Sequence, residues 1–132
     1  MLILVVEDEP IAALSAMWEL QRAGHEVVGP AHTREEALHL AHGRQLDLAL
    51  VDIDLKEAGE GVEVAKQLRT MNVASVFVSA QSEVAQKHRD LALGYLCKPY
   101  SSTELVRSVD VIDKVMNGGL PPAVPGALRL FA

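Results

Sequence analysis

The sequence contains a single cysteine, Cys97, and therefore can form no disulfide bond within the chain. Aromatic residues make up only 4% of it, so the core must be built from Leu, Val, Ala and Ile. Its apolar runs are far shorter than the roughly 18 residues of a membrane span. The N-terminal residues also lack the basic segment and cleavage site of a signal peptide. We therefore expect a cytoplasmic protein that does not insert into a membrane.

Positive charge is also scarce, with 12 Lys and Arg against 18 Asp and Glu and a formal net charge of −6. Nucleic-acid binding is driven by clustered Lys and Arg that release counterions from phosphates, so direct contact with nucleic acid is not expected. The 132 residues suffice for one domain but not for two well-cored ones. We expect the domain to span residues 1–117. Residues 118–132 turn to Gly, Pro and small apolar residues, which predicts an extended tail or a truncated linker.

Short apolar segments bounded by turn residues predict five buried strands, at 2–6, 25–29, 47–52, 74–78 and 94–97. Helical periodicity predicts five helices between and after them, at about 10–24, 33–42, 62–70, 82–91 and 101–117. Thr33 with Glu36, and Ser101 with Glu104, have the spacing of capping boxes. This alternation predicts an α/β protein of the flavodoxin-like class. Its five parallel strands would form a doubly wound (βα)5 sheet in three α/β/α layers.

Acidic residues follow two of the predicted strands, where ligands bind in sheets of this class. Glu7 and Asp8 end the first strand and Asp52 ends the third. Three converging carboxylates would repel one another and raise their pKa values unless a cation relieved the repulsion. All-oxygen ligation favours Mg²⁺, or Mn²⁺, over Zn²⁺. We therefore expect a divalent metal site here.

Two further residues on the same rim favour an anion beside the metal. Ser79 ends the fourth predicted strand and Lys98 follows the fifth. A phosphoryl group on Asp52 could place one oxygen on the metal, one on the Lys98 ammonium and one on the Ser79 hydroxyl. The pattern therefore favours Asp52 as a phosphoryl acceptor.

Over residues 2 to about 117 the chain resembles the CheY-like receiver domain of two-component response regulators. Each matching motif stands at the corresponding strand end and in the family's order, which makes the set specific. The motifs are Val6-Glu7-Asp8-Glu9, Val51-Asp52-Ile53-Asp54-Leu55, Val78-Ser79-Ala80 and Lys98-Pro99-Tyr100. The resemblance implies a signalling module, not an enzyme with a small-molecule substrate. It also implies that Asp52 takes its phosphoryl group from a sensor histidine kinase or a histidine phosphotransfer protein.

The resemblance also implies how the metal is held. Asp8 and Asp52 would bind Mg²⁺ directly, together with the backbone carbonyl of Asp54, and Glu7 would act through water. Glu7 stands where the family more often has aspartate. Asp54 and Gln81 occupy positions that tune hydrolysis of the phosphoryl group in the family.

A switch follows from the resemblance as well. Lys98 would pair with the phosphoryl group, and its bond to Pro99 is usually cis in the family. Ser79 and Tyr95 match the switch pair, so phosphorylation would draw Ser79 toward the phosphate and turn Tyr95 inward. This would alter the face formed by the predicted helix 82–91, the strand 94–97 and the helix 101–117, where a downstream protein would bind.

Two other functions fit parts of the pattern. Asp52-Ile53-Asp54 also resembles the nucleophile motif of haloacid-dehalogenase-like phosphatases, but those enzymes carry it after their first strand. A receiver-shaped interaction module that is never phosphorylated is the other alternative. Since the 132 residues hold no DNA-binding or enzymatic output segment, the chain either signals through its own surface or is one part of a longer regulator, and we favour a stand-alone receiver.

The remaining residues of interest have structural interpretations. Trp18, which follows Leu14 at helical spacing, is predicted to lie in the core. The five histidines are predicted to be solvated, with none on the rim. Val111 and Val115 either widen the core stripe of the last helix or form a homodimer or partner surface. Three apolar residues near the C-terminus could dock on the domain or on a partner, or belong to a linker: Leu128, Leu130 and Phe131.

Overall fold

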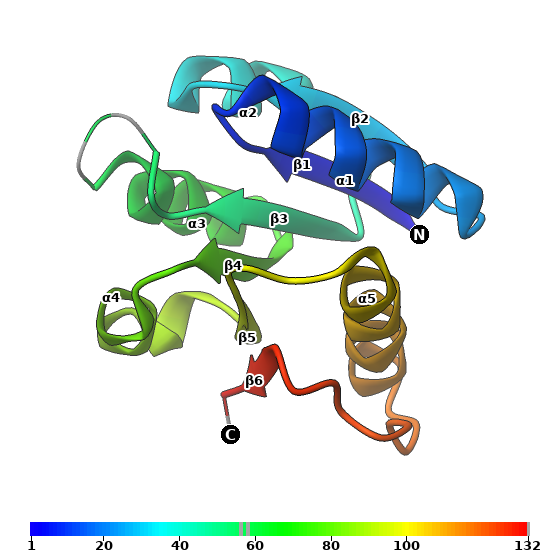
Figure 1. Ribbon diagram of the computed structural model, residues 1–132. Helices are drawn as coiled ribbons and strands as arrows, with labels where there is room; N and C mark the ends of the chain where they lie inside the picture. The colour runs from blue at the N-terminus through cyan, green and yellow to red at the C-terminus, as the bar shows by residue number, and fades with distance from the viewer. Residues whose placement is uncertain (56, 58, 132) are drawn as a thin grey trace.

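The computed structural model describes residues 1–55, 57 and 59–131, and within them six strands form one sheet (Figure 1). The strands are β1 (Leu2–Val6), β2 (Glu26–Ala31), β3 (Leu48–Asp52), β4 (Ala74–Ser79), β5 (Gly94–Cys97) and β6 (Leu128–Leu130). Their order is β2-β1-β3-β4-β5-β6. The first five are parallel, which confirms the predicted doubly wound sheet. β6 was not predicted and runs antiparallel to β5.

Helices cover both faces of the sheet, as the sequence predicts. α1 (Pro10–Arg22) and α5 (Ser102–Met116) lie on one face. α2 (Arg34–Ala41), α3 (Glu60–Thr70) and α4 (Ser82–Lys87) lie on the other. The helix predicted at 82–91 is shorter than expected, because a 3₁₀ turn, Arg89–Leu91, follows α4. Burial on both faces explains why β3 is an unbroken apolar run up to Asp52.

Of the two predicted capping boxes, the one at Ser101 is complete, whereas at Thr33 the Glu36 side chain accepts the Thr33 hydroxyl and not its amide. The Thr33 side chain accepts a hydrogen bond from the Glu36 amide at 3.2 Å. At the start of α5, Ser101 and Glu104 form a complete capping box, in which each side chain accepts the other residue's amide. These bonds satisfy amides that a helix N-terminus otherwise leaves without partners.

The prediction that Trp18 lies in the core is wrong, since 56% of its surface is exposed. Ala13, Ala16 and Leu20 face the sheet instead, and they lie on the opposite side of α1 from Ile11, Leu14 and Trp18. Small alanines allow α1 to pack closely on the sheet. As a result, the larger residues form an apolar stripe on the outer face of α1, with the Arg22 guanidinium 4.6 Å from the centre of the Trp18 ring.

On α5, each of the two interpretations given for Val111 and Val115 applies to one of them. Val111 is fully buried, so it belongs to a wide core stripe, whereas Val115 is 38% exposed. Among the helices in the described part of the chain, none is long and apolar enough to cross a membrane.

The C-terminal segment docks on the domain. β6 pairs with β5 along Gly94↔Leu130, Tyr95↔Arg129 and Leu96↔Leu128. Figure 1 shows the chain leaving α5, turning back and returning to the sheet beside β5. The sequence left open whether the apolar C-terminal residues dock on the domain, on a partner or belong to a linker. In the structure they dock on the domain itself.

Candidate phosphoacceptor site

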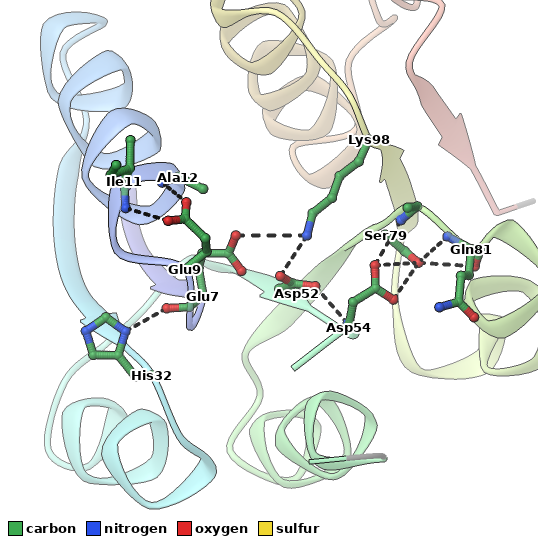
Figure 2. A network of polar contacts seen from close by, with 11 residues as sticks. Glu7, Glu9, Ile11, Ala12, His32, Asp52, Asp54, Ser79, Gln81 and Lys98 are labelled. Atoms are coloured by element: carbon green, nitrogen blue, oxygen red, sulfur yellow. Dashed lines mark hydrogen bonds and ion pairs between the residues drawn. The ribbon is translucent and has the colours of Figure 1, made fainter. Parts of the chain in front are cut away.

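Four strand ends meet on one rim of the sheet and bring the predicted polar residues together (Figure 2). Asp52 is the last residue of β3 and Ser79 the last of β4, while Glu7 and Lys98 come directly after β1 and β5. The register Asp52↔Val78 and Ser79↔Cys97 keeps these ends nearly level. Parallel pairing thus places side chains that are far apart in sequence within contact distance.

The Asp52 carboxylate is buried, with 3% of the residue exposed, and both of its oxygens have partners. Oδ2 accepts a hydrogen bond from the Lys98 ammonium at 2.8 Å. Oδ1 accepts one from the backbone amide of Asp54 at 2.7 Å. Together these two bonds satisfy the buried carboxylate and fix its orientation.

Glu7, Asp8 and Asp52 each offer a carboxylate oxygen, and these oxygens lie within 4.8 Å of one another. Burial, followed by the hydrogen bond and negative charge of Asp52, raises the pKa of Glu7 to about 8. The buried Oε2 atom of Glu7 has no hydrogen-bond partner among the described residues. A divalent cation held by oxygen ligands would relieve both the charge repulsion and the orphaned oxygen, so these residues fit Mg²⁺.

Lys98 is the positive charge at the centre of the site. Its ammonium lies 2.8 Å from Asp52 and 3.9 Å from Glu7. Burial alone would lower the pKa of Lys98, but the hydrogen bond and charge of Asp52, with smaller contributions from Glu7 and Asp54, raise it overall. Lys98 is therefore a permanent cation available to a second anion. The peptide bond between Lys98 and Pro99 is cis.

Ser79 contacts Asp54 in this structure and not Asp52. Its hydroxyl lies 3.2 Å from Asp54 Oδ1 and accepts a hydrogen bond from the Gln81 amide at 2.8 Å. The other Asp54 oxygen accepts the Ala80 amide at 3.0 Å. Figure 2 shows Asp54 standing between Asp52 and the Ser79–Gln81 loop. The side chain of Asp54 thus ties the end of β4 to the loop that follows β3.

Tyr95 does not join this group on the rim. It lies within β5, is only 5% exposed, and belongs to the core on the side of α3 and α4. Its ring is 5.7 Å from that of Phe131, centre to centre. The C-terminal segment therefore covers the tyrosine of the predicted switch pair.

The sequence assigned no role in the site to three further residues at the rim. His32, predicted to be solvated and away from the rim, is half-buried, with Nδ1 2.8 Å from the Glu7 carbonyl oxygen. It follows β2 directly, so the rule for strand ends would have found it had β2 been extended to Ala31. Glu9 caps α1 by accepting the amides of Ile11 and Ala12.

Tyr100, the third of these residues, closes the site on the side of α1 and α5. It lines a small cavity of about 20 Å³ together with Glu7 and Asp52. Burial, with the charge of Glu7 next, raises the pKa of its hydroxyl. A groove of about 390 Å³ continues outward from Glu7 and Lys98 between the starts of α1 and α5. The rim is therefore accessible from this side.

Comparison with known proteins assigns the chain to a family. Residues 3–110 match the response regulator receiver domain. The chain is 27% identical over 113 residues to the transcriptional regulatory protein PdtaR of Mycobacterium tuberculosis, covering 83% of this chain and 55% of that protein. It is 35% identical over 115 residues to the alkaline phosphatase synthesis transcriptional regulatory protein PhoP of Bacillus subtilis, covering 83% and 47%. The chain thus spans about half the length of these curated relatives.

Solved structures agree with this match. The response regulator TrrA of Thermotoga maritima, in complex with Mg²⁺ and beryllium fluoride, is 29% identical with a TM-score of 0.71, over 88% of this chain and 96% of that one. A CheY-like receiver domain of Methanospirillum hungatei is 25% identical with a TM-score of 0.74, over 89% and 98%. An acidic cluster of the kind formed by Glu7, Asp8 and Asp52 is typical of the Mg²⁺ site in receivers.

Proposed function

The chain belongs to the response regulator receiver domain family, and we propose that its function is to accept a phosphoryl group on Asp52 from the phosphohistidine of a sensor histidine kinase or a histidine phosphotransfer protein. A receiver is a signalling module and not a classical enzyme. Residues 1–117 would form this module. The observation that carries the proposal is the buried Asp52 carboxylate, held between the Lys98 ammonium and the acidic cluster.

The chemistry needs a carboxylate that is oriented and an environment that tolerates additional negative charge. An Asp52 oxygen would form the new bond to phosphorus as the bond between phosphorus and the donor imidazole nitrogen breaks. Lys98, already beside Asp52, would stabilise the charge on the phosphoryl oxygens in the transition state and the product. The Asp54 amide on Oδ1 keeps the carboxylate oriented.

Mg²⁺ would be held by Asp8, Asp52 and the backbone carbonyl of Asp54, with Glu7 acting through water. When bound, it would neutralise part of the negative charge of the carboxylates and the phosphoryl oxygens. Mn²⁺ satisfies the same oxygen ligands. The raised pKa and orphaned oxygen of Glu7 support a metal at this position.

Signalling would follow from a change of partner by Ser79. To reach a phosphoryl oxygen, its hydroxyl would have to leave Asp54, which is its partner now. Asp54 therefore competes with the phosphoryl group for Ser79, and with Gln81 it would tune how long the phosphoryl group persists. Movement of Ser79 and Tyr95 would alter the surface of α4, β5 and α5, where a downstream protein would bind in the cytoplasm.

The phosphodonor would approach along α1. The outer apolar stripe of Ile11, Leu14 and Trp18 begins one turn after the acidic residues, and the 390 Å³ groove beside it opens onto Lys98. A donor helix with an apolar face could pack on this stripe while its phosphohistidine reaches Asp52. Contact with nucleic acid or a membrane has no support in the charge or the helices of the described residues.

Intact-mass analysis after incubation with acetyl phosphate and Mg²⁺ tests the proposal. We expect the wild-type chain to gain one phosphoryl group and the Asp52→Asn variant to gain none. Asp110→Asn, at an exposed position on α5, serves as the matched control and should be labelled normally. Labelling that persists in Asp52→Asn would overturn the assignment. A complete lack of labelling would favour a non-phosphorylated interaction module, and rapid turnover of a phosphate ester would favour a phosphatase.

A further inference from the structure

The edge of β5 is occupied by the C-terminal residues of the same chain. Hydrogen bonds join the Cys97 amide to the Ala127 carbonyl at 2.8 Å and the Phe131 amide to the Leu93 carbonyl at 2.9 Å. These two bonds flank the ladder between β5 and β6. The backbone groups that an edge strand would expose are therefore paired along the length of β5.

Side chains anchor the same segment on both faces of the sheet. Leu128 is only 1% exposed, and Leu130 packs against the core shared by α1 and α5. On the other face Phe131 packs on Tyr95, and the Arg89 guanidinium lies 5.5 Å from the centre of the Phe131 ring. Alternation along residues 128–131 thus directs Leu128 and Leu130 to one face of the sheet and Phe131 to the other.

A glycine in β5 allows this close approach. A Cβ atom at Gly94 would clash with the Arg129 carbonyl oxygen and lie 3.1 Å from the Leu130 Cα, both backbone atoms of the docked segment. Backbone atoms cannot rotate away as the end of a flexible side chain can. Any larger residue at position 94 would therefore push β6 off the edge.

The docked segment also reaches the phosphoacceptor site through one residue. The Cys97 amide donates to the Ala127 carbonyl of the docked segment. The next residue is Lys98, whose amide donates to the Ser79 carbonyl at 3.0 Å. The ammonium of Lys98 contacts Asp52. A phosphoryl group on Asp52 would draw Ser79 away from Asp54, and a shift of Ser79 would pull on the end of β5 through the bond from the Lys98 amide to the Ser79 carbonyl. Because β6 holds the end of β5 in place, its docking opposes this movement of Ser79.

We infer that the edge of β5 is a strand-binding surface and that residues 127–131 are its resident ligand, which holds the site in its unphosphorylated arrangement and covers Tyr95. The second half of this inference rests on the proposed function. If docking disfavours an anion at Asp52, linkage requires that an anion at Asp52 weakens docking by the same factor. Phosphorylation would then release residues 127–131 and free the edge of β5.

Hydrogen exchange of the full chain tests both halves, with the Phe131 and Cys97 amides as reporters. Without an anion, both amides should exchange slowly, because each is bonded across the edge. Saturating beryllium fluoride with Mg²⁺, used as a phosphoryl mimic, should speed their exchange by at least about fivefold, the lower end of typical coupling. Fast exchange in the anion-free chain would overturn the docked strand.

The Gly94→Ala variant should undock residues 127–131, because its Cβ would clash with the backbone of Arg129 and Leu130. We expect it to bind beryllium fluoride at least about fivefold more tightly than the wild type. Gly126→Ala is the matched control, since a Cβ there meets no atom within 4 Å, and its affinity should be unchanged. Equal affinity in Gly94→Ala, or exchange at Phe131 that beryllium fluoride leaves unchanged or slows, would overturn the coupling.

Two readouts keep this inference separate from the proposed function. Failure of the wild-type chain to bind beryllium fluoride would contradict phosphoacceptor chemistry, whereas slow exchange of Phe131 without the anion would still support the docked strand. Should Gly94→Ala fail to fold, Phe131→Ala removes only the ring that covers Tyr95. It should also bind the anion more tightly than the wild type, and weaker or equal binding would count against the coupling.

Discussion

The rim around Asp52 and the edge of β5 differ in how their polar groups are satisfied. At the rim, three carboxylates crowd together, one Glu7 oxygen has no partner in the part of the chain that the structure describes, and the pKa of Glu7 is raised. At the edge, backbone groups are paired with β6 and apolar side chains fill both faces. The contrast teaches that the polar groups of the edge are satisfied within the chain, whereas those of the rim fit the cation and phosphoryl group of the proposed function.

Removing the cation of the rim should produce the largest effect. In Lys98→Met, we expect phosphorylation of Asp52 by acetyl phosphate to slow by about 10²- to 10³-fold, because one preorganised charge beside the transferring group is lost. Labelling rates from intact-mass spectra measure this. Lys114→Met, at an exposed position on α5, should retain the wild-type rate. A loss below tenfold in Lys98→Met would show that the rim does not depend on this charge.

The pH dependence of stability tests whether the pKa of Glu7 is raised when no metal is bound. Its pKa is about 8 in the folded chain against 4.5 when unperturbed, so the folded state holds a proton that the unfolded state releases. This contribution is complete below about pH 4.5 and is lost as the pH rises toward 8. In EDTA, we expect the free energy of unfolding to fall by about 1–3 kcal/mol between pH 5 and pH 8.

Urea denaturation in EDTA measures this decline, and Glu7→Gln should largely abolish it. Glu26→Gln, at an exposed position on β2, should keep the wild-type profile. Saturating Mg²⁺ should reduce the decline, because the positive charge of the metal favours the ionised form of Glu7. A flat profile in the wild type would contradict the raised pKa.

At the edge, Phe131→Ala should have the smallest effect of the three. The ring packs on Tyr95 but is only half-buried, so we expect the free energy of unfolding to fall by about 1–2 kcal/mol, less than for a buried core phenylalanine. Urea denaturation checks this, with Leu120→Ala as the control, because Leu120 is 94% exposed. Equal stability of the two variants would mean that the ring contributes nothing to the edge.

Most of the rim was predictable because buried parallel strands have a strong local pattern. Apolar runs locate the strands, and the rule that carboxyl ends meet on one edge brings Glu7, Asp52, Ser79 and Lys98 together. His32 was missed because Gly29-Pro30 looks like a turn, whereas β2 continues to Ala31. The sequence therefore locates the centre of the site more accurately than its border.

Other features depend on packing that local patterns do not encode. Helical spacing groups Ile11, Leu14 and Trp18 on one face of α1 but does not say which face is inward, and the small alanines took that place. β6 pairs with a strand more than 30 residues earlier in the chain, and its Leu-Arg-Leu pattern names no partner. The contact of Ser79 with Asp54 likewise depends on the conformation of two loops.

The glycine at position 94 has a consequence for how the protein behaves in concentrated solution. While β6 is docked, the outermost strand of this edge is three residues long and carries the exposed Arg129, so it offers little to a neighbouring molecule. A side chain at position 94 would uncover β5, whose unpaired backbone groups are a template for pairing between molecules. We expect a chain altered at this position to self-associate and lose solubility at concentrations that the wild type tolerates.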